Sequence, residues 1–204
     1  MNVQTVATKG NLIATKKSLQ LAKTGFELLD KKRNILVREM MTLITRATEI
    51  QDKIDLAYSR AYLALQTSNI TLGICEEIAN TVPEEKSLRL SYRSVMGVEI
   101  PIVSIDAKRN NNYIPFGLHS SNSTLDEAYL RFIEVKNLTA DLAEIENSVY
   151  RLADAIKKTQ KRANALKNIM IPKFEATIKM ISSALDEKNR EEFSRLKIIK
   201  KKKP

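Results

Sequence analysis

The sequence contains very few of the residues on which most metal sites and turn-rich folds depend. Among its 204 residues are one Cys, one His, five Gly, five Pro and no Trp. The single thiol, Cys75, excludes an intrachain disulfide and a multi-cysteine zinc module. The single imidazole, His119, excludes histidine-rich metal sites and catalytic designs that need two histidines. The shortage of Gly and Pro argues against sandwiches, barrels and propellers, because those folds need a turn every ~8–12 residues.

Long apolar runs are also missing. No stretch approaches the ~18–20 apolar residues of a membrane helix, and residues 1–11 are polar, without the apolar segment of a secretory signal. Apolar residues nevertheless make up 43% of the chain, which excludes wholesale disorder. We therefore expect a soluble, intracellular and mostly helical protein.

Catalytic motifs are not found either. The sequence has no phosphate-binding loop, no dinucleotide-binding glycine motif, no zinc-protease motif and no serine-hydrolase elbow. His119 lies in a polar stretch and is interpreted as a solvated loop histidine, and Cys75 as a small core residue. The sequence thus predicts a protein that is not an enzyme and that has no catalytic residue, no cofactor and no metal.

The first third of the chain carries a sustained heptad pattern that begins at Leu12. Fourteen of the 16 a and d positions between Leu12 and Ala64 are apolar, where composition alone would give about seven. The pattern predicts a helix of about 60 residues, ~90 Å long at ~1.5 Å per residue, which needs a long partner helix to bury its stripe. The seam residues predicted from this arm are Leu19, Phe26, Leu29, Leu36, Met40 and Leu43.

A second apolar stripe in the same chain can supply that partner. It begins near Ser123, which with Asp126 or Glu127 downstream predicts a helix N-cap. Met170, Phe174 and Ile178 are four residues apart instead of alternately three and four, next to Pro172, so we expect a stutter and a mild kink there. The seam residues predicted from this arm are Leu142, Ile145, Val149, Leu152, Ile156 and Leu166.

The fold class that follows is all-α: a long antiparallel two-helix coiled coil with a short β-hairpin and loop inserted in the middle. The predicted boundaries are an N-terminal arm over residues 1–75, a middle segment over 76–122, a C-terminal arm over 123–200 and a basic tail over 201–204. Antiparallel pairing of two arms of similar length predicts a slender rod with both termini at one end.

The middle segment breaks the helical pattern. Thr81-Val82-Pro83 ends a helix, and residues 88–105 are rich in β-formers around a possible Met96-Gly97 turn. Pro101 indicates an edge position. Because an isolated two-stranded hairpin is barely stable in water, this one must pack on the coil or on a partner.

Two features of the first arm lie outside the simple seam. Arg33 occupies an a position, where a charged residue either fixes the register of the coil or extends its head out to solvent. A second apolar row contains Leu21, Leu28 and Ile35 and resumes at Leu56 and Leu63. This row is either a set of tolerated surface leucines, the contact for a third helix, or a surface that bears on another protein of a complex.

The net charge of +10 is concentrated at the two ends of the sequence. Residues 188–204 hold eight basic and two acidic side chains. One interpretation is a coiled-coil adaptor or tether whose basic tail binds nucleic acid or anionic membrane. The sequence argues against nucleic acid as the partner, because no aromatic residue alternates with the terminal lysines to stack on bases.

Specific stretches along nearly the whole chain resemble a known family. The second arm carries KRANAL at 161–166, Ile171-Pro172, Leu185-Asp186-Glu187 and Arg195-Leu196-Lys197, and the middle carries VMGV at 95–98 followed by Ile100-Pro101. The first arm adds a run of Leu and basic residues from Thr8 to Leu36. These stretches resemble the D subunit of the V-type and A-type ATPases, the central rotor shaft of those complexes.

The resemblance implies a non-catalytic axle that transmits torque between the catalytic A/B ring and the rotor ring in the membrane. Its partners would be the A and B subunits, the small F subunit beside the hairpin, and the funnel-shaped subunit on the membrane ring. It would bind no nucleotide or nucleic acid directly, and it would be peripheral to the membrane through the complex. The residues expected to contact partners are Leu21, Leu28, Ile35, Val98, Ile100, Pro101, Lys197 and Lys200.

Overall fold

The computed structural model describes residues 6–105, 116–117 and 121–202. His119 lies outside these residues. The chain divides into two compact units, one made of residues 1–35 and 156–204 and the other of residues 36–155. Each unit is described by itself below.

The first arm is one continuous helix, α1 (Lys9–Leu72), which confirms the long helix predicted from the heptads. Its first turn is capped by Thr8, whose Oγ1 accepts a hydrogen bond of 3.2 Å from the backbone N–H of Asn11. It ends where Gly73 adopts a φ of +82° and donates its N–H to the carbonyl of Asn69. A glycine tolerates this left-handed conformation at a helix end because it has no Cβ.

The second arm consists of α3 (Ser123–Ala165), a π-helical turn at Leu166–Met170 (η3) and α4 (Ile171–Lys202). The cap of α3 is Asn122 instead of the predicted Ser123. The Asn122 Oδ1 accepts hydrogen bonds from the backbone N–H of Leu125 and from the Thr124 hydroxyl. An amide oxygen one residue earlier therefore satisfies the free donors of the first turn.

The π-helical turn falls where the apolar stripe changes spacing. The N–H of Ile171 donates to the carbonyl of Leu166, five residues earlier. Pro172 follows at once, and a proline inside an α-helix has no N–H and its ring clashes with the carbonyl four residues back. The wider turn takes up one additional residue. The predicted irregularity is therefore present, in the form of a π turn.

In the unit formed by residues 1–35 and 156–204, α1 runs antiparallel to η3 and α4. The Lys23 ammonium lies 2.9 Å from the Glu175 carboxylate, and the Lys167 ammonium lies 5.7 Å from the centre of the Phe26 ring. Ala22, Thr159, Ala163 and Ile181 are buried. Small residues in this seam let the two backbones approach closely.

In the unit formed by residues 36–155, α1 and α3 also run antiparallel. Ala57 and Ala61 pack on Val135, and the ring of Tyr62 meets the ring of Phe132 edge to face with centroids 5.8 Å apart. At the end of this pair, the Asn122 amide donates to the Thr71 hydroxyl at 3.0 Å. The alanine side chains pack directly on Val135, and the two aromatic rings cover this contact. The seam is therefore filled without long side chains.

The middle segment contributes α2 (Glu76–Ala79) and an antiparallel hairpin of β1 (Leu88–Val95) and β2 (Val98–Ile105). The predicted turn at Met96-Gly97 is confirmed, since both residues have positive φ, 51° and 77°. Two left-handed residues in succession produce the tight turn whose twist matches that of paired strands. The all-α architecture with a hairpin insertion is thus confirmed.

Candidate partner-binding surfaces

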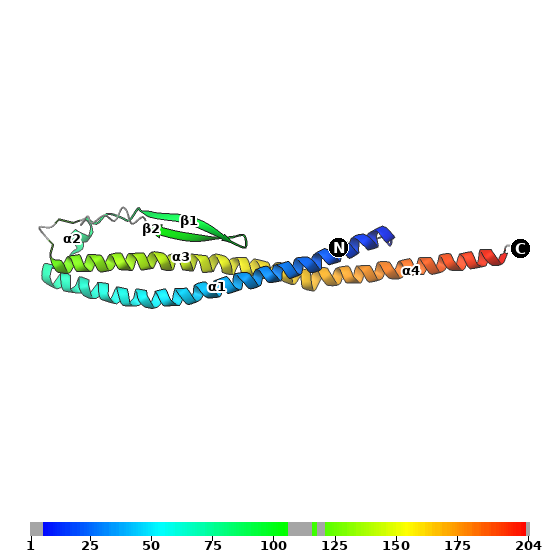
Figure 1. The fold of residues 1–204 in the computed structure, drawn as a ribbon, viewed down its shortest axis with the longest axis horizontal. Coiled ribbons are helices and arrows are strands. Elements are labelled where there is room, and N and C mark those ends of the chain that lie inside the picture. The colour runs from blue at the N-terminus through cyan, green and yellow to red at the C-terminus, as the bar shows by residue number, and fades with distance from the viewer. Residues whose placement is uncertain (1–5, 106–115, 118–120, 203–204) are drawn as a thin grey trace. The chain divides into compact units, whose positions relative to one another are not determined.

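The hairpin packs on the helices of its own unit through β2. The Val103 N–H donates to the Glu144 carboxylate at 2.7 Å, and Arg151 donates to the Glu99 carbonyl at 3.2 Å. Figure 1 shows β2 between β1 and α3. From β1, the Arg93 guanidinium reaches the Glu39 carboxylate of α1 at 2.7 Å. The coil thus provides the packing that a two-stranded hairpin needs.

Two of the predicted partner-contact residues are enclosed by this packing. Ile100 is 2% exposed, and Pro101 is buried as well. The expectation that both offer a surface to a partner is therefore wrong, because other residues of this chain already cover them. Val98, close to the turn, is half-buried.

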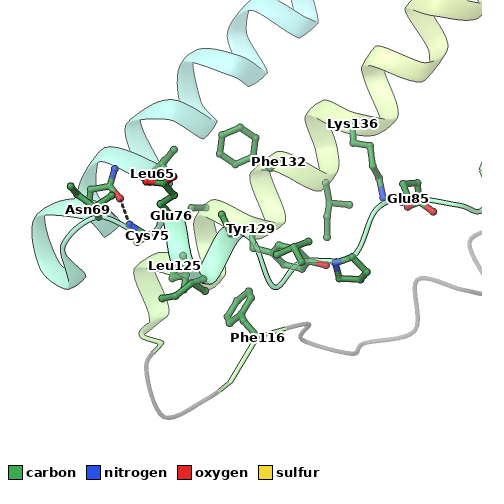
Figure 2. Close-up of a pocket in the computed structure, with 17 residues that line it drawn as sticks. Leu65, Asn69, Cys75, Glu76, Glu85, Phe116, Leu125, Tyr129, Phe132 and Lys136 are labelled. Atoms are coloured by element: carbon green, nitrogen blue, oxygen red, sulfur yellow. Dashed lines mark hydrogen bonds and ion pairs between the residues drawn. The ribbon is translucent and has the colours of Figure 1, made fainter.

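An open cavity of about 600 Å³ lies where α1 ends and α3 begins. Figure 2 shows its lining from four parts of the unit: Leu65 from α1, Cys75 beside α2, Phe116 from the middle segment, and Leu125 and Tyr129 from α3. Cys75 is buried among apolar side chains, as predicted, and its backbone N–H donates to the Asn69 side chain at 3.4 Å. The walls are mainly apolar, so the cavity is suited to apolar side chains.

One charged pair lies at the rim of this cavity. Glu85 accepts hydrogen bonds from the Lys136 ammonium and from both the hydroxyl and the N–H of Ser87 (Figure 2 labels Glu85 and Lys136). These bonds, with that from Lys136 as the largest, lower the pKa of Glu85 from 4.5 to about 2. The ionised pair ties the segment after α2 to α3.

The second apolar row of α1 is exposed in both units. In the unit containing residues 1–35, Leu21 and Leu28 are 75% and 61% exposed, and Ile35 is also exposed. In the other unit, Leu56, Leu63 and Ile70 continue the seven-residue spacing and are exposed. The described part of this chain therefore supplies no third helix to cover the row.

The C-terminal part of α4 makes a different surface. Every side chain from Asp186 to Lys201 is exposed, including Phe193, Leu196 and Ile199. Lys197 and Lys200, both predicted to contact partners, lie among these apolar residues. A helix end with large apolar and basic side chains, on which no described residue packs, is typical of a surface that another protein covers.

Arg33, the charged residue in the predicted seam, is half-buried and fully engaged. Its guanidinium donates to the Gln160 side chain at 2.8 Å and lies 2.7 Å from the Asp30 carboxylate. Arg33 thus reaches across to the second arm, as a residue that fixes register would.

The remaining predicted seam residues are buried or half-buried, and none is exposed. Their role in a single seam stays a prediction. Buried are Leu36, Leu43, Ile145 and Leu152; half-buried are Leu19, Phe26, Leu29, Met40, Leu142, Val149, Ile156 and Leu166.

Comparison with known proteins decides between the shaft and the tether as interpretations of the whole chain. A sequence model of the family described as the D subunit of ATP synthase matches residues 11–201. The chain belongs to the ATP synthase D-subunit family. It is 46% identical to the V-type ATP synthase D subunit of Thermotoga neapolitana, with 96% of each chain covered.

Archaeal relatives extend this similarity. The chain is 37% identical to the A-type ATP synthase D subunit of a Desulfurococcus species and 36% identical to that of Thermococcus kodakarensis. In both comparisons 95% of this chain and 92% of the relative are covered. The prediction of a central-stalk component of a V/A-type ATPase is confirmed, and the tether interpretation is not supported.

Two kinds of site are absent from the residues that the structure describes. No helix in ranges 6–105 and 121–202 is long and apolar enough to cross a bilayer. Within the same residues, no three His, Cys, Asp or Glu side chains are grouped so that they could hold a metal ion.

Proposed function

We propose that this chain is the non-catalytic rotor shaft of a V/A-type ATP synthase, and that it transmits torque between the catalytic A/B ring and the rotor ring in the membrane. The observation that carries the proposal is the match to the D-subunit family over residues 11–201, which covers both helical arms and the hairpin. The proposal includes the division into arms 1–75 and 123–200, a middle segment 76–122 and a tail 201–204.

The packing of the helices suits a torque-bearing role. In each unit, α1 is held to the second arm by fully buried residues, such as Leu36 and Leu152 in one and Ile181 in the other. Paired helices resist bending and twisting better than a single helix. A shaft without threefold symmetry inside a ring of alternating A and B subunits touches equivalent sites differently, and this difference biases their conformations.

The exposed end of α4 is the candidate contact with the catalytic ring. Phe193 and Leu196 offer apolar area, and Lys197 and Lys200 offer positive charge to acidic groups of the A and B subunits. The F subunit would bind beside the hairpin, and the funnel-shaped subunit would bind the opposite end of the shaft. The chain would then be cytoplasmic and peripheral to the membrane through the complex.

Co-expression with the other proteins of the complex tests this proposal. We expect the purified chain to hydrolyse no ATP and to co-purify with the A, B and F subunits. A chain ending at Lys188 should still fold and bind the F subunit, but should lower the ATPase activity of the complex at least tenfold. A matched control, Leu130→Glu on the exposed face of α3, should leave that activity within about twofold.

Two results would contradict the proposal. One is ATP hydrolysis by the purified chain alone. The other is salt-sensitive binding to DNA or to anionic vesicles that is lost on deletion of residues 200–203, together with no assembly with the A, B and F subunits, since this combination is the behaviour of a tether.

A further inference from the structure

The apolar stripe of the second arm contains one residue more than a regular heptad spacing allows. Up to Met170 its residues alternate steps of three and four, and from Ile178 they do so again, but Phe174 lies four residues from both. An α-helix turns by about 100° per residue, so an uncorrected addition would rotate Ile181 out of the seam. Ile181 is instead fully buried. The π turn at Leu166–Met170 therefore absorbs the additional residue and returns the stripe to its seam.

Pro172 explains why the irregular turn lies at this place. In a regular α-helix a proline has no N–H to donate, and its ring clashes with the carbonyl four residues back. Without Pro172 the spacing would also be regular, because Met170 and Phe174 would then be three residues apart and Phe174 and Ile178 four. A single deletion can therefore remove the proline and the additional residue together.

Burial is low on both helices around this turn. The structure describes every residue from 164 to 180 of the second arm and from 23 to 35 of α1, and none of them has a buried side chain. One contact that joins the helices beside the turn, the ion pair of Lys23 and Glu175, lies at the surface with both side chains about half exposed. A helix with an interrupted hydrogen-bond ladder and few buried apolar side chains deforms at low cost.

α1 has a weak helix former opposite the turn. Gly25 lies in the interior of α1, and a Cβ placed on it would be 3.8 Å from Cδ1 of Leu166, the first residue of the π turn. That distance is an ordinary van der Waals contact, so the packing does not require a residue without a side chain here. Glycine stabilises the interior of a helix less than alanine does. Both helices are therefore weakened at the same level of the pair.

We propose that residues 166–172 and Gly25 form a flexible joint, at which residues 173–202 twist and bend relative to residues 156–165 when the chain carries torque. The torque part of this inference rests on the proposed function. Sharp bends in helices occur at prolines and at π turns, and this joint has both. Because the π turn keeps Ile181 in the seam, the pair can deform here without separating.

Deletion of Pro172 tests the joint in the free, full-length chain. The deletion leaves a regular alternation of three and four, so a continuous α-helix can replace the π turn. We expect the amides of residues 167–171 to exchange with solvent at least about tenfold more slowly than in the wild type. Deletion of Lys157 is the matched control. Lys157 lies where the steps are already regular, so its loss should rotate the following stripe by about 100° out of the seam and make exchange faster.

Gly25→Ala tests the joint from the other helix and leaves the length of the chain unchanged. The alanine side chain fits against Leu166 and favours the helix, so the amides of residues 24–28 should exchange about fivefold more slowly. The matched control is Gly10→Ala, at a second helical glycine, where no described atom lies within 4 Å of the added Cβ. This control should leave the amides of residues 24–28 unchanged.

Single-molecule rotation tests whether the joint takes up twist. In a complex held by its catalytic subunits, the joint lies in the chain between the end of α4 and a bead on Asp141→Cys of α3, in a Cys75→Ser background. Thermal motion spreads the angle of the bead during each pause, and a stiffer shaft narrows this spread. We expect deletion of Pro172 to lower the angular variance by about twofold, because it removes both causes of a bend. Gly25→Ala should lower the variance less, and Gly10→Ala should not change it.

The outcomes separate the joint from the shaft. Slower exchange in the Pro172 deletion together with a smaller angular variance supports the joint. If residues 167–171 exchange equally fast with and without Pro172, or if this deletion destabilises the helix as deletion of Lys157 does, the joint is wrong whatever the complex does. If exchange slows but the variance is unchanged, the twist lies elsewhere and the joint is overturned, while rotation of the bead upholds the shaft. If no bead rotates while the complexes hydrolyse ATP, the shaft proposal fails and the torque role of the joint fails with it.

Discussion

The two units use one heptad pattern but cover it to different extents. In residues 36–155, the α1–α3 pair is flanked by α2, the hairpin and an aromatic cluster, and its seam is closed by buried alanines and valine. In residues 1–35 and 156–204, the helix pair has no additional element among its described residues. Between Ser182 and Lys201 no side chain of α4 is buried.

This difference indicates where intrachain packing ends and partner binding begins. A helix whose side chains are all exposed gains little from hydrophobic burial, so its order in a complex must come from contacts with other chains. We therefore expect substitutions in the unit of residues 36–155 to act mainly on stability. Changes near the end of α4 should act on assembly and activity.

The largest expected effect is a charge in the best-buried seam position. Leu152 is fully buried, and Leu152→Lys places an uncompensated ammonium between α1 and α3. We expect a loss of about 3–5 kcal/mol in the free energy of unfolding, measured by urea denaturation followed by circular dichroism. Leu130 lies on the same helix and is 65% exposed, so Leu130→Lys should change the free energy of unfolding by less than about 0.5 kcal/mol. Equal effects of the two substitutions would show that this pairing is wrong.

Overpacking should have a smaller effect. Ala61 is fully buried against the second arm, so Ala61→Leu should cost about 1–3 kcal/mol of stability because the backbones must move apart. Ala143→Leu on the exposed side of α3 provides the control and should be nearly neutral. A stable Ala61→Leu variant with an unchanged melting curve would mean that the seam is looser than described.

These two sites also show what the sequence could predict. The apolar stripe of the second arm identified Leu152 as a seam residue, and Met96-Gly97 identified the hairpin turn, because these signals are local. Asn122 was missed as the cap, since Ser123 and Thr124 offer equally suitable side chains. Only the structure shows which one reaches the backbone N–H of Leu125.

Features that depend on distant residues could not be predicted. The cavity combines Leu65, Cys75, Phe116 and Tyr129, which no short pattern connects. The attachment of β2 to α3 uses hydrogen bonds from Val103 to Glu144 and from Arg151 to Glu99, which join residues forty to fifty positions apart.

The Glu85–Lys136 pair predicts a modest pH dependence in the unit of residues 36–155. Because the folded-state pKa of Glu85 is lowered to about 2, its contribution is complete above pH 4.5 and is lost as the pH falls towards 2. An exposed pair of this kind contributes about 0.2–1 kcal/mol. Glu85→Gln should therefore be less stable than the wild type at pH 7, and the difference should shrink as the pH falls from 4.5 and vanish below about pH 2. Glu84→Gln is the matched control, and an equal loss there would exclude a specific role of Glu85.

The smallest effect on stability is expected at the end of α4. Deletion of residues 189–204 removes only exposed side chains among those described, so the free energy of unfolding should change by less than about 0.5 kcal/mol. A larger loss, measured by the same urea titration, would show that this end is already packed in the free chain and would remove the contrast between the two units.

The central claim is that this chain turns as the shaft of the complex, and single-molecule rotation tests it most directly. A complex fixed to a surface through its catalytic subunits would carry a bead on Asp141→Cys, an exposed site of α3, in a Cys75→Ser background. On addition of ATP, the account predicts unidirectional rotation of the bead. A bead that stays still while the same complexes hydrolyse ATP would contradict it.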